Sequence, residues 1–190
     1  IGVVINGLTQ YQKHTAKSKV VASIESEGLT SLGLIPEDRR LLAPTVGQLA
    51  AHLNGRFTVG EKFTDGLIEH IMVGGLGLDN GVDYFGLRNA KAVVVRGDRP
   101  DIQMAALHTP TTCMVLTQDT EPIEYVRNEA ELEEIPVIVV PTNTLDTMAA
   151  LHNMQELIRF DHSSKLERFI DLMDKHVDVN PIHDVLDVRK

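Results

Sequence analysis

The chain has 190 residues, 43% of them hydrophobic, which is enough for one domain of about 100 to 150 residues with smaller appendages. Its formal net charge of −9 argues against nucleic-acid binding, because a phosphate backbone requires a basic surface. No apolar run approaches the roughly 20 residues that span a bilayer, so no membrane segment is expected. The single cysteine, Cys113, cannot form an internal disulfide, which suits a reducing cytoplasm and a packing role in a strand.

Hydrophobic periodicity predicts short strands that alternate with helices along most of the chain. Strands are expected at residues 3–6, 31–35, 56–59, 69–73, 92–95, 114–117 and 137–140. Helices are expected at 12–27, 46–53, 78–85 and 165–177, with further helical sequence after the strands that end at 95, 117 and 140. Such alternation implies right-handed crossovers and a largely parallel sheet covered on both faces. The sequence therefore predicts an α/β fold.

Three of these helices begin with polar residues that can cap them. Thr45 and Gln48 have the spacing of a capping box, in which the hydroxyl accepts a free N–H and the glutamine reaches back. Thr144 is expected to cap the helix after the strand at 137–140, and Ser164 with Glu167 to open the final helix. Leu166, Phe169, Ile170, Met173 and Val177 recur at helical spacing in that final helix.

The turn after the strand at 92–95 is the first candidate for a binding site. It places Gly97, Asp98 and Arg99 at the carboxyl end of a strand, where open α/β sheets bind their ligands. Pro100 suits the first position of the following helix. The turns at 117–120 and 141–144, and the glycines at 74–77, are expected at the same edge. The candidate ligand-binding residues are Gly74, Gly75, Gly77, Gly97, Asp98, Arg99, Thr117, Thr142, Asn143 and Thr144.

Each part of this edge has two interpretations. Arg99 could clamp a phosphate or carboxylate through two donors, or Asp98 and Arg99 could pair with each other or with a neighbouring helix end to fix the turn. The glycines at 74–77 could let the backbone approach a phosphate, or could be present because the turn requires positive φ.

The remaining polar residues suggest no catalytic machinery. The eight histidines are scattered and lack metal-ligand spacing, so we expect no metal site. No serine lies in a Gly-x-Ser-x-Gly elbow, and no catalytic residue is assigned. The acidic residues between 129 and 134 are interpreted as the solvated face of a helix.

Several segments together resemble the DRTGG domain family. Gly97-Asp98-Arg99-Pro100-Asp101-Ile102-Gln103 is similar to the signature that names the family, with Pro100 and Asp101 where the name has Thr and Gly. The segment at 34–46 is similar to the junction between a dethiobiotin-synthetase-like ATPase domain and a DRTGG domain, and 134–144 to the last strand and turn. Relatives of this layout are phosphotransacetylase-like.

The resemblance implies a domain organisation. Residues 1–44 are expected to be the tail and linker of the ATPase-like domain, 45–160 the DRTGG domain, and 161–190 a C-terminal helix and tail. It also implies a three-layer sandwich around a mostly parallel sheet. No G-x-x-x-x-G-K-[ST] motif occurs, so ATP hydrolysis by this chain alone is not expected.

The resemblance suggests two functions. The first is a non-catalytic regulatory and oligomerisation module, expected as a cytoplasmic homodimer, that senses an adenine nucleotide or other anionic ligand for an attached ATPase-like or phosphotransacetylase-like enzyme. The alternative is the C-terminal part of a dethiobiotin-synthetase-like or phosphate acetyltransferase-related enzyme whose phosphate-binding half lies outside this chain. For the chain by itself we lean against an enzyme.

Overall fold

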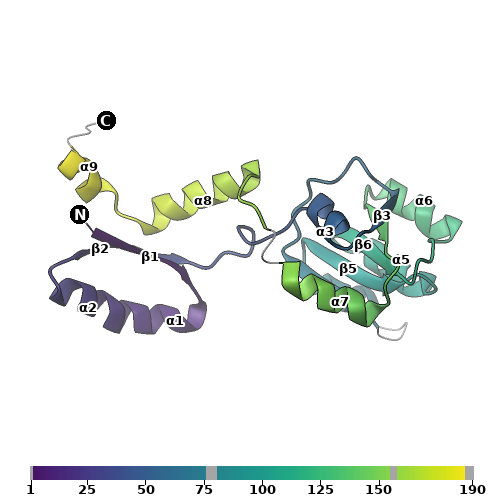
Figure 1. Ribbon diagram of the computed structural model, residues 1–190, viewed down its shortest axis with the longest axis horizontal. Coiled ribbons are helices and arrows are strands. Elements are labelled where there is room, and N and C mark those ends of the chain that lie inside the picture. Colours follow the sequence, from purple (N-terminus) through teal and green to yellow (C-terminus); the bar gives the residue numbers. More distant parts are fainter. Residues whose placement is uncertain (1, 76–80, 155–157, 187–190) are drawn as a thin grey trace. The chain divides into compact units, whose positions relative to one another are not determined.

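The computed structural model describes residues 2–75, 81–154 and 158–186, and the chain divides into two compact units (Figure 1). One unit comprises Leu42–Arg159 and the other comprises Ile1–Leu41 with Phe160–Lys190. The expected C-terminal appendage therefore packs in the same unit as the N-terminal segment.

The larger unit is built on a five-stranded sheet in the order β3-β7-β6-β5-β4. Four strands are parallel, and β3 pairs with β7 in the antiparallel sense. The strands are β3 (Arg56–Val59), β4 (His70–Gly74), β5 (Lys91–Arg96), β6 (Thr111–Thr117) and β7 (Val137–Val139). The predicted mixed α/β fold with a mostly parallel sheet is thereby confirmed.

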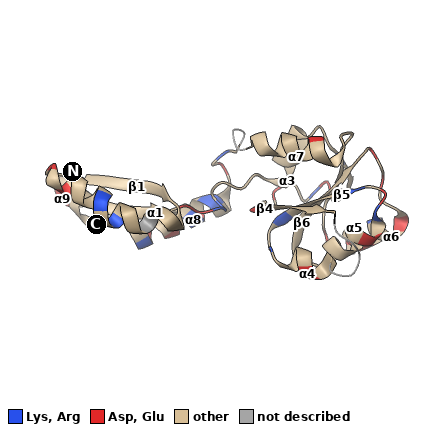
Figure 2. Ribbon diagram, turned by 90° about the horizontal axis from the view of Figure 1, so that it is seen from below, with Lys and Arg blue, Asp and Glu red and all other residues tan. Residues whose placement is uncertain are grey.

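Helices cover both faces of this sheet, as Figure 2 shows for α3 and α7 on one side and α4 on the other. They are α3 (Val46–His52), α4 (Gly81–Gly86), α5 (Pro100–Leu107), α6 (Glu124–Leu132) and α7 (Thr144–His152). Successive residues of a strand point to opposite faces, so Val93 and Val95 of β5 pack with α4, α5 and α6, whereas Ala92 and Val94 pack with α3 and α7. The result is a three-layer sandwich.

The helix starts follow the capping rules with one correction in this unit. The predicted box at α3 is present: Thr45 Oγ1 accepts from Gln48 N at 3.2 Å, and Gln48 Oε1 accepts from Thr45 N at 2.9 Å. The expectation that Thr144 caps α7 is wrong. Asn143 is the N-cap, because its Oδ1 accepts from Asp146 N at 2.9 Å.

The smaller unit contains a parallel pair of strands, β1 (Gly2–Leu8) and β2 (Thr30–Pro36). They are joined by one helical run: α1 (Gln10–Thr15), a π-helical turn (Ala16–Val20) and α2 (Val21–Ser26). Two helices follow the larger unit in sequence, α8 (Ser163–His176) and α9 (Asn180–Leu186). The sequence predicted the first of these two and not the second.

The final predicted helix differs in its start and in its buried face. His162 rather than Ser164 is the N-cap of α8, and it accepts from Ser164 N at 3.2 Å through its ring. Leu172 packs against Leu32 and Ile35 of β2 in the core of this unit. Two members of the predicted apolar stripe, Leu166 and Ile170, are instead about half exposed (53% and 50%).

Candidate functional site

The predicted site residues lie at one edge of the five-stranded sheet. Gly74 ends β4, Gly97 follows β5, Thr117 ends β6, and Thr142 follows β7. These four strands are parallel neighbours, so their carboxyl ends meet at the same edge. We call this edge the carboxyl rim, and its described members are Gly74, Gly75, Gly97, Asp98, Arg99, Thr117, Thr142, Asn143 and Thr144. The remaining candidate, Gly77, lies outside the described residues.

The turn at Gly97 is shaped by its contacts with the neighbouring turn. Gly97 N donates to Thr117 O at 3.3 Å, and a Cβ on Gly97 would lie 2.6 Å from the carbonyl oxygen of Thr120. Real Cβ atoms do not approach that closely, so only glycine fits here. The turn after β5 is therefore packed directly against the turn after β6.

A buried glutamine holds the same turn from inside. The Gln103 amide nitrogen donates to the carbonyls of Arg96 and Gly97 at 2.9 and 3.0 Å. Its Oε1 is buried, and within the described residues it has no hydrogen-bond partner. Gln103 belongs to the segment that resembles the family signature, but no positioning role was predicted for it. The contact arises only because the fold brings α5 under the turn.

The rim arginines are each held by a carboxylate two residues away. Arg99 donates from Nε to Asp101 Oδ1 at 2.9 Å and from Nη2 to Oδ2 at 2.6 Å. Arg96 pairs with Asp98 in the same two-pronged way. Asp98 and Arg99 thus do not pair with each other, and Arg99 is tied to the first turn of α5. The hydrogen bond from Arg99 lowers the pKa of Asp101 below its ordinary value.

The rim hydroxyls mostly bind one another. Thr117 Oγ1 lies 3.2 Å from Thr144 Oγ1, and Thr142 Oγ1 lies 2.7 Å from Thr147 Oγ1. Thr117 is fully buried, so it joins the turn after β7 to the end of β6. The exposed side chains of the rim are those of Asp98, Thr142 and Asn143, and Arg99 is partly exposed. Arg96, the last residue of β5, adds an exposed guanidinium group beside them, and we include it in the rim from here on. Chemically, the rim presents two guanidinium groups whose carboxylate partners leave further N–H donors free.

Gly74, the last residue of β4, and Gly75, which follows it, do not have the backbone conformation that we expected of them. Neither Gly74 nor Gly75 has positive φ, so the interpretation that the turn requires it is wrong for these two residues. A Cβ on Gly74 would instead lie 2.6 Å from Ile102 and 2.7 Å from Val95. Gly74 is therefore required by close packing of β4 against β5 and α5.

Backbone strain at the rim was also absent from the sequence predictions. Gln118 and Asp119 both have positive φ, of 69° and 48°, which residues with a side chain rarely adopt. Their amides donate to Thr142 O and Val140 O, each at 2.9 Å. These hydrogen bonds stabilise the turn. Asp119 is of a residue type that tolerates this conformation, whereas Gln118 gives no such signal.

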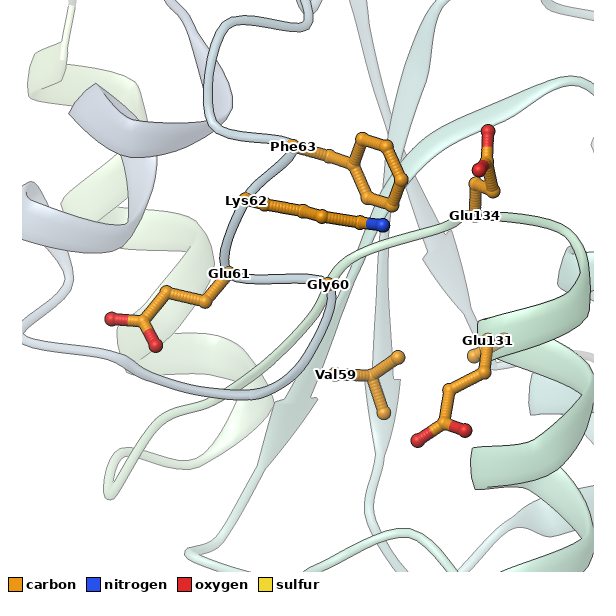
Figure 3. A pocket seen from close by; sticks show the side chains of 8 residues that line it. Val59, Gly60, Glu61, Lys62, Phe63, Glu131 and Glu134 are labelled. Carbon is orange, nitrogen blue, oxygen red and sulfur yellow. The ribbon is translucent and has the colours of Figure 1, made fainter.

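A pocket of about 690 Å³ lies at the opposite edge of the sheet. Because β3 runs against β7, its last residue, Val59, pairs with Val137 at the amino end of β7. The pocket is formed between the segment that follows β3 and the end of α6 (Figure 3). It is lined by Val59, Gly60, Glu61, Lys62, Phe63, Ala130, Glu131 and Glu134. The sequence had indicated only a solvated acidic face here.

The part of the chain that the structure describes contains neither a metal-binding cluster nor a helix that could span a membrane. Within residues 2–75, 81–154 and 158–186, no group of three or more His, Cys, Asp or Glu side chains could hold a metal ion. In the same ranges, no helix combines the length and the apolar character needed to cross a membrane.

The fold and rim define a three-layer α/β domain, and comparison with known proteins assigns its family. Residues 48–154 match the DRTGG domain. Since this match covers more than half of the chain, the protein belongs to the DRTGG domain family. The family resemblance noted in the sequence is confirmed.

Curated relatives include two bacterial phosphate acetyltransferases. The chain is 29% identical over 155 residues to that of Nitrosomonas europaea, covering 77% of this chain and 22% of the relative. It is 21% identical over 193 residues to that of Nitratidesulfovibrio vulgaris, covering 96% of this chain and 27% of the relative. The chain thus spans about a quarter of the length of these relatives.

A solved structure with a similar fold comes from Clostridium perfringens. It contains the CBS and DRTGG domains of the regulatory region of a pyrophosphatase, complexed with the activator diadenosine tetraphosphate. The TM-score is 0.53 at 12% sequence identity, and the match covers 92% of this chain and 87% of that one. At this level of identity the likeness shows the fold alone.

Proposed function

We propose that this chain is a non-catalytic regulatory and oligomerisation module that senses a small anionic or nucleotide ligand for an attached enzyme. The observation that carries the proposal is its membership of the DRTGG family. The similar fold in a regulatory region that binds diadenosine tetraphosphate supports an adenine nucleotide as the ligand.

The carboxyl rim is the proposed ligand site. Arg96 ends β5 and Arg99 directly precedes α5, so both lie at the turn that joins these elements. Their planar guanidinium groups match the oxygens of phosphates and carboxylates. A ligand would bind through their remaining donors or take the place of the aspartates. The exposed side chains of Thr142 and Asn143 add neutral polar groups to the same edge.

The proposed partners follow from the relatives. The two phosphate acetyltransferases extend well beyond the matched region, which supports an attached phosphotransacetylase-like or ATPase-like enzyme. We propose that the module acts as a homodimer, as the family resemblance suggests. A cytoplasmic location is proposed because the chain has one cysteine, Cys113, which cannot form an internal disulfide and is buried in β6.

Calorimetric titration with diadenosine tetraphosphate, ATP and acetyl phosphate tests the rim. A ligand at about a hundred times its dissociation constant adds roughly 2.7 kcal/mol to stability, so thermal unfolding gives a second readout. Arg99→Ala should weaken binding by about tenfold or more, since charge-assisted hydrogen bonds contribute about 1.5 to 3 kcal/mol. Arg88→Ala is the matched control, because it removes the same charge from the exposed segment before β5. Equal binding by both variants would exclude the rim.

The alternative is that the chain belongs to an enzyme whose phosphate-binding half lies outside it. The smaller unit favours this candidate, because β1 and β2 form a parallel pair joined by a helical crossover, as in nucleotide-binding α/β domains. The test is ATP hydrolysis by a polypeptide that carries these residues with their flanking sequence. Hydrolysis lost on deleting β1 and β2 would favour the enzyme, and its absence with intact ligand binding would favour the regulatory module.

A further inference from the structure

The pocket at the amino edge of the sheet has an apolar floor. Val59 and Ala130 are buried, and Phe63 is partly buried beside them. Gly60 makes the turn at φ +70°, and a Cβ there would lie 2.9 Å from Pro136 Cα. This close approach, which only glycine permits, brings the segment after β3 against the segment before β7. The floor is thus set by the fold and is suited to an apolar ligand part.

The wall of the pocket carries more negative than positive charge. Glu131 and Glu134 stand on one side, and Lys62 reaches across from the other in Figure 3, where Glu61 points away. For none of these four side chains do the described residues supply a hydrogen bond or an ion pair. Glu131 and Glu134 are exposed, and with one lysine opposite them they leave the wall with a net negative charge, which attracts a cation.

The ammonium group of Lys62 lies over the aromatic ring of Phe63 in the pocket. Lys62 Nζ lies 4.7 Å from the centroid of Phe63 (Figure 3). A cation within about 6 Å of a ring centroid is attracted by the negative face of the ring. Lys62 is itself exposed and flexible, so it can leave the ring at little cost. The lysine therefore occupies the position that a cationic ligand would take.

We propose that this pocket binds a small organic cation, an ammonium or guanidinium group attached to an apolar chain. The cationic group lies on Phe63 in place of Lys62 and faces Glu131 and Glu134, and the apolar chain contacts Val59 and Ala130. This site is separate from the carboxyl rim, which lies at the other edge of the sheet and favours anions. The pocket proposal does not depend on the proposed function.

Calorimetric titration of the full chain with 1,5-diaminopentane and with phenethylamine, at about 0.15 M salt so that more distant charges are screened, tests this proposal. Glu131→Gln and Glu134→Gln should each weaken binding by about threefold or more, as expected for an exposed charge pair. Glu133→Gln is the matched control, since it removes the same charge from an adjacent residue that does not line the pocket. It should change binding by less than about twofold.

Lys62→Met tests whether the ligand takes the place of the lysine ammonium group. Removing the resident cation should strengthen binding of both amines by about two- to fivefold, the range of an exposed cation–π contact. The proposal is overturned if neither amine binds at millimolar concentration, or if Glu133→Gln weakens binding as much as the two lining variants. It is also overturned if Lys62→Met weakens binding, because the lysine would then be part of the site and not a cation that the ligand displaces. Circular dichroism of each variant establishes that it is folded.

Discussion

Lys91 is a fully buried lysine at the start of the central strand β5. Its Nζ donates to the carbonyl oxygen of Pro110 at 2.9 Å, and burial lowers the pKa of Lys91 from 10.5 to about 8. Burial penalises the charged form, because the amine loses water and gains one carbonyl in return. We predict that replacing Lys91 with an apolar residue of similar length stabilises the larger unit at neutral pH.

The magnitude follows from the change in pKa. A fall from 10.5 to about 8 corresponds to about 3 kcal/mol of penalty on the charged form. Below about pH 8 the lysine is protonated in both the folded and unfolded states, so the full penalty is present. Between about pH 8 and 10.5 the unfolded chain holds a proton that the folded chain has released, so the free energy of unfolding rises with pH through this window.

Urea unfolding of the wild type, Lys91→Met and Lys91→Arg at several pH values measures this effect. At pH 7, Lys91→Met should be more stable than the wild type by about 1 to 3 kcal/mol, the penalty less the lost hydrogen bond. The difference should shrink toward zero or reverse as the pH approaches 10.5. Lys91→Arg should lack the rise in stability between about pH 8 and 10.5, because its guanidinium keeps its proton in the folded state.

A constant difference between the wild type and Lys91→Met from pH 7 to 10.5 would refute this reasoning. It would mean that Lys91 keeps its proton in the folded state. Comparing the wild type with Lys91→Met cancels the contributions of all groups that the two proteins share.

Two further results are expected. Gly97→Ala should destabilise the larger unit by about 1 to 3 kcal/mol in urea unfolding, because the new Cβ meets the Thr120 carbonyl at 2.6 Å. An unchanged midpoint would mean that the two turns separate easily. Cys113 should react with a thiol reagent only after unfolding, since burial raises its pKa to about 12. Rapid reaction of the folded protein would show that β6 opens locally.

Local sequence patterns correctly predicted the features that depend on contacts between residues close together in the chain. The capping box at Thr45 and Gln48 was predicted because its two hydrogen bonds join residues three apart. The β-branched run of β5 was predicted from composition, and it is fully buried as expected. The rim was predicted because the carboxyl ends of parallel strands meet at one edge.

Local patterns were wrong where two neighbouring residues could play the same part. Asn143 and Thr144 can both cap a helix, and Asn143 does so because the turn after β7 gives it an extended backbone. His162 precedes Ser164 as the cap of α8 for a similar reason, since its ring nitrogen accepts the free amide. Sequence cannot separate such candidates, because the choice depends on where the preceding chain arrives.

Periodicity and short motifs were sufficient to predict the α/β class, the family and the residues at the rim. The order of the strands, the burial of Lys91 and the position of Gln103 beneath the turn at Gly97 became known only from the folded chain. The tertiary structure also decided the pocket between Lys62 and Glu131, whose residues are far apart in the chain. Burial, strand order and pocket shape depend on contacts between residues far apart in the chain, which no local pattern encodes.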